Sequence, residues 1–243
     1  MFVDFSCKFD KINVLEENRD FLIIEKPSGL LVHGDKYSRG ACLVDLILKD
    51  YPEIKEIGQL GRSGIVHRLD KEASGLMVIA RNKEMYNRLL EQFQGRKIKK
   101  EYLTLVYGCL KDNKGEINLP LGRNKKGKII AVLYRKQIKQ EKEAKTGYEV
   151  RQRFTQPQEF TLLNVFLFTG RTHQIRVHFK SIGHPIVGDK EHRIKNLKLE
   201  KTLRLNRLFL HACYLGFNDL QNNWREFRKD LPIELKNFLT ELK

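Results

Sequence analysis

Short strand-like runs and amphipathic helical segments follow one another along this chain without a regular alternation. A regular alternation would predict parallel strands joined by helices. The mixed order instead favours an α+β fold with a mixed, mostly antiparallel central sheet and flanking helices. Neither of the glycine-rich loops GxGxxG and GxxxxGK[ST] occurs, so a fold that cradles a dinucleotide or a nucleoside triphosphate is not predicted. Strands are expected at 75–82, 101–108, 160–170 and 208–217, and helices at 41–54, at 83–93, after Thr172 and after Asp230.

The N-terminal part of the chain contains two apolar runs, at 21–33, which are joined by the residues Lys-Pro-Ser-Gly at 26–29. Proline followed closely by glycine is typical of a turn between strands, so we expect a hairpin here. A chain of 243 residues is long enough for one dominant core. The expected organisation is a short extension at 1–20 and one main domain at 21–243.

The charge of the chain is strongly positive. Forty-six Lys and Arg against thirty Asp and Glu give a formal charge of +16 and a pI near 9.7, which points to a polyanionic partner, RNA or DNA. A basic surface kept for solubility is the alternative. The basic stretch at 123–145 is either a solvated loop pair or an arm that follows phosphates, and the sequence leaves both open.

Targeting and cysteine signals are weak. No apolar stretch of about 18 residues and no charged start followed by an apolar core occurs, so we expect a cytoplasmic protein with no membrane partner. The four cysteines lie far apart without a CxxC pair. Neither a structural zinc site nor a disulfide framework is therefore predicted, and we expect reduced thiols.

The segment at 64–82 places three polar residues, His67, Arg68 and Asp70, between apolar residues and a predicted buried strand. A carboxylate held at the edge of a sheet and flanked by cations is suited to act as a nucleophile or a base. Asp70 is therefore a catalytic candidate. The alternative is that Asp70 only shapes the chain, by accepting hydrogen bonds from backbone N–H groups of the following turn.

The segment at 168–189 predicts a strand, a sharp turn at Gly170, and a helix that Thr172 caps and that ends near Gly183. Arg171 should lie where the strand meets the helix. A guanidinium there can orient a carboxylate through a bidentate pair or hold a phosphate near the helix start.

His173 and His178 in the same segment are potential metal ligands. Their spacing fits neither HExxH nor a helical face shared by residues i and i+4. No metal is therefore predicted, and both histidines are expected to be hydrogen-bonded helix residues.

Three blocks of this sequence resemble the RluA-type family of RNA pseudouridine synthases. HRLDKEASGL is similar to the catalytic motif of that family, KKEYLTLVYG to its tyrosine motif, and TGRTHQIRVHF with GHPIVGD to its arginine motif. The blocks occur in the order of the family, and the likeness extends from about residue 21 to the C-terminal helix. The resemblance implies the pseudouridine synthase fold, with a mostly antiparallel sheet and a central cleft.

The resemblance also implies roles for individual residues. It implies that Asp70 is the essential aspartate, that Tyr102 stacks on the target base, that Arg171 pairs with the aspartate, and that Arg68 enters the RNA stack where the uridine is flipped out. An enzyme acting on a base in folded RNA must extrude that base and replace its stacking. By itself, Tyr102 could be an ordinary core tyrosine of a strand. Further candidates for RNA contact are His67, Arg176 and Lys100.

The expected function is that of an enzyme isomerising uridine to pseudouridine in structured RNA, without a cofactor and as a monomer. Ribosomal RNA of the large subunit is the first expected substrate and transfer RNA the second. Two alternatives remain: a non-catalytic RNA-binding assembly factor of the same fold, and a hydrolase that flips a nucleotide and releases the base. Free uracil would identify the hydrolase.

Two features depart from the pattern of the family. Many relatives carry a separate N-terminal RNA-binding domain, whereas only about twenty residues precede the first expected strand here, so target choice should rest on the catalytic domain. After GDKEH the chain continues as a basic run at 193–207, where many relatives have a glycine-rich turn. That run is a further candidate for phosphate contact.

Overall fold

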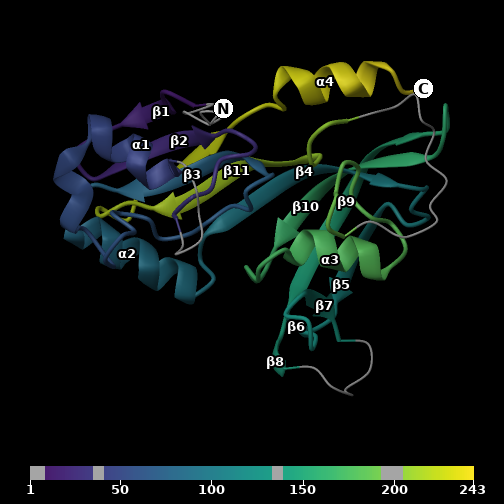
Figure 1. Cartoon of the computed structure of the whole chain (residues 1–243), viewed down its shortest axis with the longest axis horizontal. Helices are drawn as coiled ribbons and strands as arrows, with labels where there is room; N and C mark the ends of the chain where they lie inside the picture. Colours follow the sequence, from purple (N-terminus) through teal and green to yellow (C-terminus); the bar gives the residue numbers. More distant parts are fainter. Residues whose placement is uncertain (1–8, 35–40, 133–138, 193–204) are drawn as a thin grey trace, which may run out of the picture. The chain divides into compact units, whose positions relative to one another are not determined.

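The computed structural model describes residues 9–34, 41–132, 139–192 and 205–243 (Figure 1). The chain divides into two compact units, one formed by Met1–Ile98 with Tyr214–Lys229, and the other by Lys99–Cys213 with Asp230–Lys243. We call them unit 1 and unit 2. Both combine helices with strands that pair antiparallel, which confirms the predicted α+β class and the mostly antiparallel sheet.

The strands of unit 1 follow the order β1-β2-β3-β11, and β12 pairs with β11. β3 is buried along its whole length, as its continuous apolar sequence predicts. Its neighbour β2 is also almost fully buried. The bounds are β1 Asn13–Glu17, β2 Phe21–Lys26, β3 Ser74–Ala80, β11 Leu210–Asn218 (in unit 1 from Tyr214 onward) and β12 Trp224–Arg228.

The predicted hairpin at 21–33 is wrong. β2 pairs with β1 on one edge and with β3 on the other, so the second apolar run finds no free edge of β2. Its carbonyls instead accept hydrogen bonds from the start of helix α1 (Leu43–Asp50): Leu43 N donates to Leu31 O at 2.8 Å and Val44 N to Val32 O at 3.1 Å. The run therefore satisfies otherwise unpaired helix amides.

The first strand also begins earlier than expected. β1 lies within the segment 1–20 that we predicted to precede all strands. Its residues alternate between exposed and half-buried positions, and only Val14 and Glu16 face inward. A strand with so few apolar residues gives a weak signal in the sequence.

The helices of unit 1 occur where they were predicted. α1 is followed by a short 3-10 helix, η1 (Pro52–Glu56), and α2 spans Lys83–Gln94. The side chain of Asn82 caps α2 by accepting a hydrogen bond from Met85 N at 2.8 Å. The helix buries Met85, Tyr86 and Leu89 in a cluster whose other members include Phe21, Ile23, Leu76, Val78 and Phe217. The core of unit 1 thus lies between α2 and the strands.

The strands of unit 2 follow the order β11-β4-β10-β9-β5. β10 is central and pairs antiparallel with both β4 and β9. The predicted strands at 101–108, 160–170 and 208–217 are confirmed as β4, β10 and β11. The bounds in this unit are β4 Lys99–Tyr107, β5 Lys114–Asn118, β9 Lys145–Phe154 and β10 Phe160–Leu167, with β11 contributing its residues up to Cys213.

A small three-stranded sheet in unit 2 occupies part of the basic stretch, with the order β7-β6-β8. Its strands are β6 Leu121–Arg123, β7 Ile129–Ala131 and β8 Lys139–Lys142. Helix α3 (Gln174–Ser181) contacts β7 and β9 (Figure 1). Val177 of α3 packs with Leu121 and Ala144 in a small apolar cluster. The described part of the stretch is therefore ordered around an apolar centre rather than a pair of solvated loops.

The last helix, α4 (Ile233–Thr240), buries Leu235 and Phe238 in unit 2. The ring of Phe238 contacts those of Phe160 and Phe209 edge to face, at centroid distances of 6.4 and 6.3 Å. This confirms the helix predicted after Asp230. The apolar positions 235 and 238 set its buried face.

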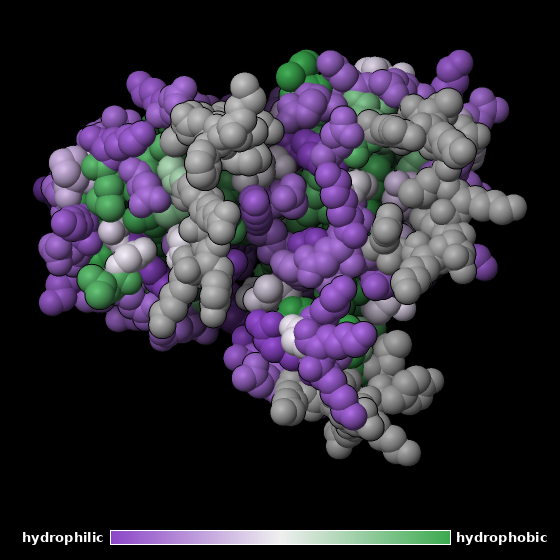
Figure 2. Space-filling model, in the orientation of Figure 1, coloured by the Kyte–Doolittle hydropathy of each residue, from purple (hydrophilic) through white to green (hydrophobic). Residues whose placement is uncertain are grey.

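Figure 2 shows mostly hydrophilic residues on the displayed face, with smaller hydrophobic areas between them. Within the described residues, no helix is long and apolar enough to span a membrane. Cys42, Cys109 and Cys213 are free thiols, the first buried and the other two half-buried.

Candidate functional site

Asp70 lies in the turn that leads into β3. Ala73 N donates to Asp70 O at 3.2 Å, which closes the turn. Leu69 and Ala73 are buried on either side of it, whereas Asp70 itself is half-buried. The turn is thus anchored by its apolar ends and leaves the carboxylate partly accessible, at the strand edge where the sequence predicted it.

A buried lysine holds the Asp70 turn from the end of β2. Lys26 is completely inaccessible to solvent, and its Nζ donates to Pro27 O at 2.8 Å, Leu30 O at 2.8 Å and Lys71 O at 3.1 Å. A buried ammonium is tolerated only when hydrogen bonds replace its water. Lys26 therefore ties the loop after β2 to the residue that follows Asp70.

Two further hydrogen bonds join the same two segments. Gly29 N donates to Lys71 O at 2.8 Å, and Ser28 Oγ donates to Glu72 O at 2.6 Å. Gly29 has φ of +90°, in the left-handed region that favours glycine. The Lys-Pro-Ser-Gly turn predicted at 26–29 exists, but it braces the Asp70 turn instead of closing a hairpin.

His67 and Arg68 precede this turn. The Nε2 of His67 accepts a hydrogen bond from Val78 N at 3.1 Å, and its ring stacks on Phe93 at a centroid distance of 4.8 Å. Because Nε2 is the acceptor, the neutral ring carries its proton on Nδ1. His67 therefore packs inside unit 1. Arg68 is exposed, as a residue that enters an RNA stack must be.

In unit 2, Tyr102 and Lys100 lie on one face of β4, because residues two apart in a strand point to the same side. Tyr102 is opposite Val165 of β10 and is only 7% exposed. The Nζ of Lys100 lies close to Gly170, where an added Cβ would be 3.4 Å away from it. Burial lowers the pKa of Lys100. Unit 2 thus brings the ammonium of Lys100 to the turn that carries Arg171.

The Arg171 turn is organised by one buried amide. Gln174 Oε1 accepts from Thr169 Oγ1 at 2.7 Å and from Arg171 N at 3.0 Å. Gln174 Nε2 donates to Lys145 O at 3.0 Å and to Thr146 Oγ1 at 2.9 Å. A single side chain therefore joins the end of β10, the Arg171 turn and the start of β9.

The helix after this turn begins differently from the prediction. Thr172 was expected to cap α3, but the capping position is His173, with a left-handed backbone at φ of 55°. Thr172 is exposed, one residue before the capping position, and the preceding amide, Arg171 N, donates to the buried side chain of Gln174. Arg171 is half-buried, and its Nε donates to Glu143 O at 3.0 Å.

Arg176 was predicted to contact RNA, but it lies inside unit 2. Its Nε and one terminal nitrogen donate to the carboxylate of Asp189 at 2.7 and 2.8 Å, and the two side chains are 5% and 0% exposed. Burial alone would raise the pKa of Asp189, but the hydrogen bonds and charge of Arg176 outweigh it and lower that pKa. The guanidinium is therefore engaged in a buried bidentate pair.

The residues after Asp189 form part of the same cluster. Asp189 Oδ1 accepts from Glu191 N and from His192 N, both at 2.9 Å. The pKa of His192 is lowered to about 4, mainly by burial and next by the charge of Arg176. The ring of His192 is consequently neutral at neutral pH.

His178 is a buried, hydrogen-bonded helix residue, as predicted. Its Nε2 pairs with Leu119 O at 2.9 Å and its Nδ1 with Thr146 Oγ1 at 2.8 Å. A carbonyl only accepts, so Nε2 carries the proton and Nδ1 accepts from the threonine hydroxyl. Burial lowers the pKa of His178, against a smaller opposite effect of the Leu119 carbonyl. Through Thr146 the chain of hydrogen bonds continues to Gln174.

The sequence prediction missed the residues that hold the two turns. Lys26 left a weak signal, a lysine that ends the apolar run FLIIEK, whereas Gln174 left none outside the motif TGRTHQIRVHF. Asp189 was noted only as part of GHPIVGD. Asp70 comes from unit 1, and Tyr102 and Arg171 come from unit 2. The cleft implied by the resemblance stays a prediction.

Known proteins are similar to this chain in sequence. The RNA pseudouridylate synthase family matches residues 20–181. An uncharacterized RNA pseudouridine synthase of Aquifex aeolicus is 40% identical over 235 residues, covering 93% of this chain and 71% of that protein. A ribosomal large subunit pseudouridine synthase D of Blochmanniella floridana is 38% identical over 248 residues, covering 96% of this chain and 73% of that protein.

A solved structure supports the same likeness. The human RNA Pseudouridylate Synthase Domain Containing 1 has a TM-score of 0.75 at 24% identity, over 92% of this chain and 84% of that chain. At this identity the likeness concerns the fold alone. It confirms the pseudouridine synthase fold that the sequence predicted.

Proposed function

Because this chain belongs to the RluA-type family of RNA pseudouridine synthases, isomerases that convert uridine to pseudouridine in RNA, we propose that Asp70 is its catalytic carboxylate. The observation that carries the proposal is the construction of the Asp70 turn. The carboxylate is half-buried on a short turn that the buried Lys26 braces through Lys71 O. A braced, partly accessible carboxylate can meet a substrate atom with little loss of freedom.

The reaction breaks the bond between C1′ of the ribose and N1 of uracil, turns the base, and forms a bond between C1′ and C5. The hydrogen on C5 then leaves as a proton. Asp70 can attack C1′, as the carboxylates of retaining glycosidases do, or it can assist elimination to a glycal. In the second route a base such as Tyr102 takes a proton from the sugar.

Tyr102 and Arg171 complete the proposed catalytic set. We propose that the ring of Tyr102 holds the target base by stacking and that the guanidinium of Arg171 pairs with the carboxylate. Arg171 suits this role because its amide is fixed by Gln174 while its side chain is only half-buried. The small remaining exposure of Tyr102 would have to serve the base contact.

Arg68 and Lys100 are the proposed RNA contacts. Arg68 is exposed beside the Asp70 turn and can replace the flipped base in the stack. Lys100 brings a cation to the Arg171 turn. For His67 and Arg176 we propose positioning roles in place of RNA contact, because His67 stacks on Phe93 and Arg176 pairs with Asp189.

We propose ribosomal RNA of the large subunit as the substrate, with transfer RNA as the alternative. The support is the relative of Blochmanniella floridana, whose name states that activity, together with the charge of +16 that favours a large polyanion. The proposal includes a monomer that acts in the cytoplasm. Because phosphate contacts dominate affinity, binding should weaken steeply as salt is raised.

The substrate is tested with two RNAs, each labelled with tritium at uracil C5. Wild-type protein should release tritium from large-subunit ribosomal RNA and much less from a mixture of transfer RNAs. Release from transfer RNA alone would overturn the substrate assignment and leave the reaction intact. Release from neither RNA would favour the non-catalytic binding factor, and free uracil would favour the hydrolase.

A further inference from the structure

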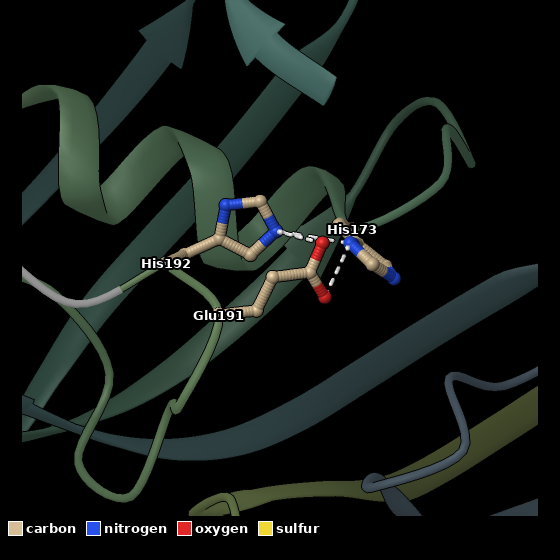
Figure 3. A group of neighbouring side chains, drawn as sticks. All are labelled: His173, Glu191 and His192. Atoms are coloured by element: carbon tan, nitrogen blue, oxygen red, sulfur yellow. Dashed lines mark hydrogen bonds and ion pairs between the residues drawn. The ribbon is translucent and has the colours of Figure 1, made fainter. Parts of the chain in front are cut away.

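Three potential metal ligands that the proposed reaction does not use converge at the start of α3. His173 comes from the capping position of the helix, and Glu191 and His192 come from the loop after Asp189 (Figure 3). The Nδ1 of His173 lies 2.9 Å from the Nε2 of His192. The two oxygens of Glu191 divide between these nitrogens: Oε2 lies 3.6 Å from His173 Nδ1, and Oε1 lies 3.6 Å from His192 Nε2.

These distances suit a single small cation. Zn²⁺ binds histidine nitrogens and carboxylate oxygens at about 2.0–2.2 Å, so neighbouring ligand atoms of a tetrahedral site lie about 3.3 Å apart. The two nitrogens lie 2.9 Å apart, each has one Glu191 oxygen at 3.6 Å, and one ligand atom from each of the three residues lies within 4.8 Å of the other two. An ion between the three side chains would require the two imidazoles to move slightly apart and one oxygen of Glu191 to approach both nitrogens.

The loop that carries two of the ligands is clamped to the helix that follows the third. Asp189 accepts the amides of both Glu191 and His192, and its carboxylate is held by Arg176 of α3. The backbone of the two ligands is thus fixed before any ion binds. A preformed site of this kind limits the ordering that binding requires.

The local charge favours a cation despite the presence of Arg176. One terminal nitrogen of Arg176 lies 3.4 Å from Glu191, but its shorter contacts, at 2.7 and 2.8 Å, are with Asp189. Two carboxylates therefore face one guanidinium, which leaves one negative charge beside two imidazoles. That donor set, two nitrogens and one oxygen, is typical of zinc sites that keep a fourth position open.

We propose that His173, Glu191 and His192 bind one divalent transition-metal ion of the Zn²⁺ class, with water in the fourth position. The side chain of Glu191 is 43% exposed, so an ion can reach the site from solvent. The side chain of His192 is only 5% exposed and closes the site on the side of the protein interior. The ion would join the loop at 189–192 to the start of α3, two residues after Arg171. Its role is structural, and no step of the isomerisation passes through it.

This site was not predictable from spacing along the chain. The sequence paired His173 with His178, but both nitrogens of His178 are engaged with Thr146 and Leu119. The partners of His173 lie nearly twenty residues further on. A loop that returns to the helix brings them together, and no local pattern encodes that return.

The test uses the full chain after treatment with a chelator, titrated with ZnCl₂ in a calorimeter and with CoCl₂ in an absorption spectrometer. We expect one saturable ion per chain, visible Co²⁺ bands of low coordination number, and a rise in the thermal midpoint with Zn²⁺. Glu191→Gln and His192→Gln should each weaken Zn²⁺ binding at least about tenfold, the lower range seen even for the loss of outer-shell partners. His184→Gln is the matched control, since this half-buried histidine of unit 2 contacts Tyr107 O instead.

Binding without saturation, or equal Zn²⁺ affinity in wild type, Glu191→Gln and His192→Gln, would overturn the proposal. So would an equal loss in His184→Gln. Glu191→Gln changes a partly exposed side chain and should keep the fold, which circular dichroism checks. If His192→Gln misfolds, Glu191→Gln still decides the proposal. The readout is ion binding, and the result is independent of whether the isomerisation proposal holds.

Discussion

The two turns that carry the proposed catalytic charges are held in the same way but by different kinds of side chain. In unit 1, Asp70 lies on a turn before a strand, and in unit 2, Arg171 lies on a turn after a strand. Each turn is held by one buried polar side chain, Lys26 for the first and Gln174 for the second. Neither of these two side chains is itself proposed to touch the substrate.

The difference lies in the charge and reach of the two side chains. Lys26 is a buried cation that contacts backbone carbonyls, one of them 45 positions away in the sequence. Gln174 is neutral, reaches backbone and side-chain atoms, and is linked through Thr146 to His178. A buried charge left without partners, or carbonyls left without it, is more costly than a lost neutral hydrogen bond. The Asp70 turn should therefore be the more fragile of the two.

Among the residues that belong to the two turns or hold them, apart from Asp70 itself, the largest effect is expected for Arg171. Arg171→Gln should lower turnover by about 10²–10³-fold, because it removes the cation that we propose to pair with the Asp70 carboxylate. The fold should persist, since the amide at this position still donates to Gln174. The turnover is measured by single-turnover tritium release. Thr172→Ala, which changes the exposed neighbouring residue, is the control. Turnover of Arg171→Gln within threefold of wild type would remove Arg171 from the catalytic set.

Lys26→Met tests the fragile turn directly. The substitution keeps the approximate length of the side chain but removes the three hydrogen bonds that Lys26 Nζ donates to backbone carbonyls, although Lys71 O still accepts from Gly29 N. The free energy of unfolding should therefore fall by about 3 kcal/mol. Urea denaturation measures the change. Lys71→Met, at an exposed position of the same turn, should behave as wild type. If Lys26→Met were as stable as wild type, the bracing of the Asp70 turn would be wrong.

Gln174→Met is the corresponding change in unit 2. It removes the hydrogen bonds to Thr169, Arg171 N and Thr146 and should lower the free energy of unfolding by about 2 kcal/mol. Gln152→Met, at an exposed position of β9, serves as the control in the same urea experiment. A loss larger than that of Lys26→Met would reverse the comparison between the two turns.

The smallest effect concerns pH. Burial lowers the pKa of His178 below its ordinary 6.5, so the unfolded chain takes up a proton that the folded chain resists. The contribution of neutral His178 to the free energy of unfolding is therefore complete above pH 6.5. It is lost as the pH falls below that value, by at most about 1.4 kcal/mol per pH unit. Urea denaturation across this range should show a shallower slope for His178→Gln than for wild type. Equal slopes for wild type and His178→Gln would contradict the account.

Much of the fold could be predicted because its signals are local. The stripe of α2 and the buried run of β3 are visible within single windows of sequence. The same holds for the blocks around Asp70, Tyr102 and Arg171, which lie where the prediction placed them on a turn, a strand and a second turn. Local sequence was enough for the elements with strong apolar patterns and for the elements that carry the residues proposed to react.

The errors share a different cause, which is pairing over distance. The hairpin at 21–33 failed because β1 and β3 occupy both edges of β2, and this depends on residues far along the chain. Arg176 was assigned to the surface because its partner Asp189 lies outside its helix. Thr172 has the residue type of a cap, but the helix begins one residue later, with His173 in the capping position. The residues that hold the site were therefore harder to predict than those proposed to react.

The central claim is that Asp70 performs the isomerisation, and one measurement tests it most directly. Wild-type protein and Asp70→Asn are incubated with large-subunit ribosomal RNA that carries tritium at uracil C5, and tritium release is followed in single turnovers. Asp70→Asn keeps the shape of the side chain, so RNA affinity should stay within a few fold while release falls by at least about 10³-fold. Release by Asp70→Asn at a rate near that of wild type would contradict the assignment.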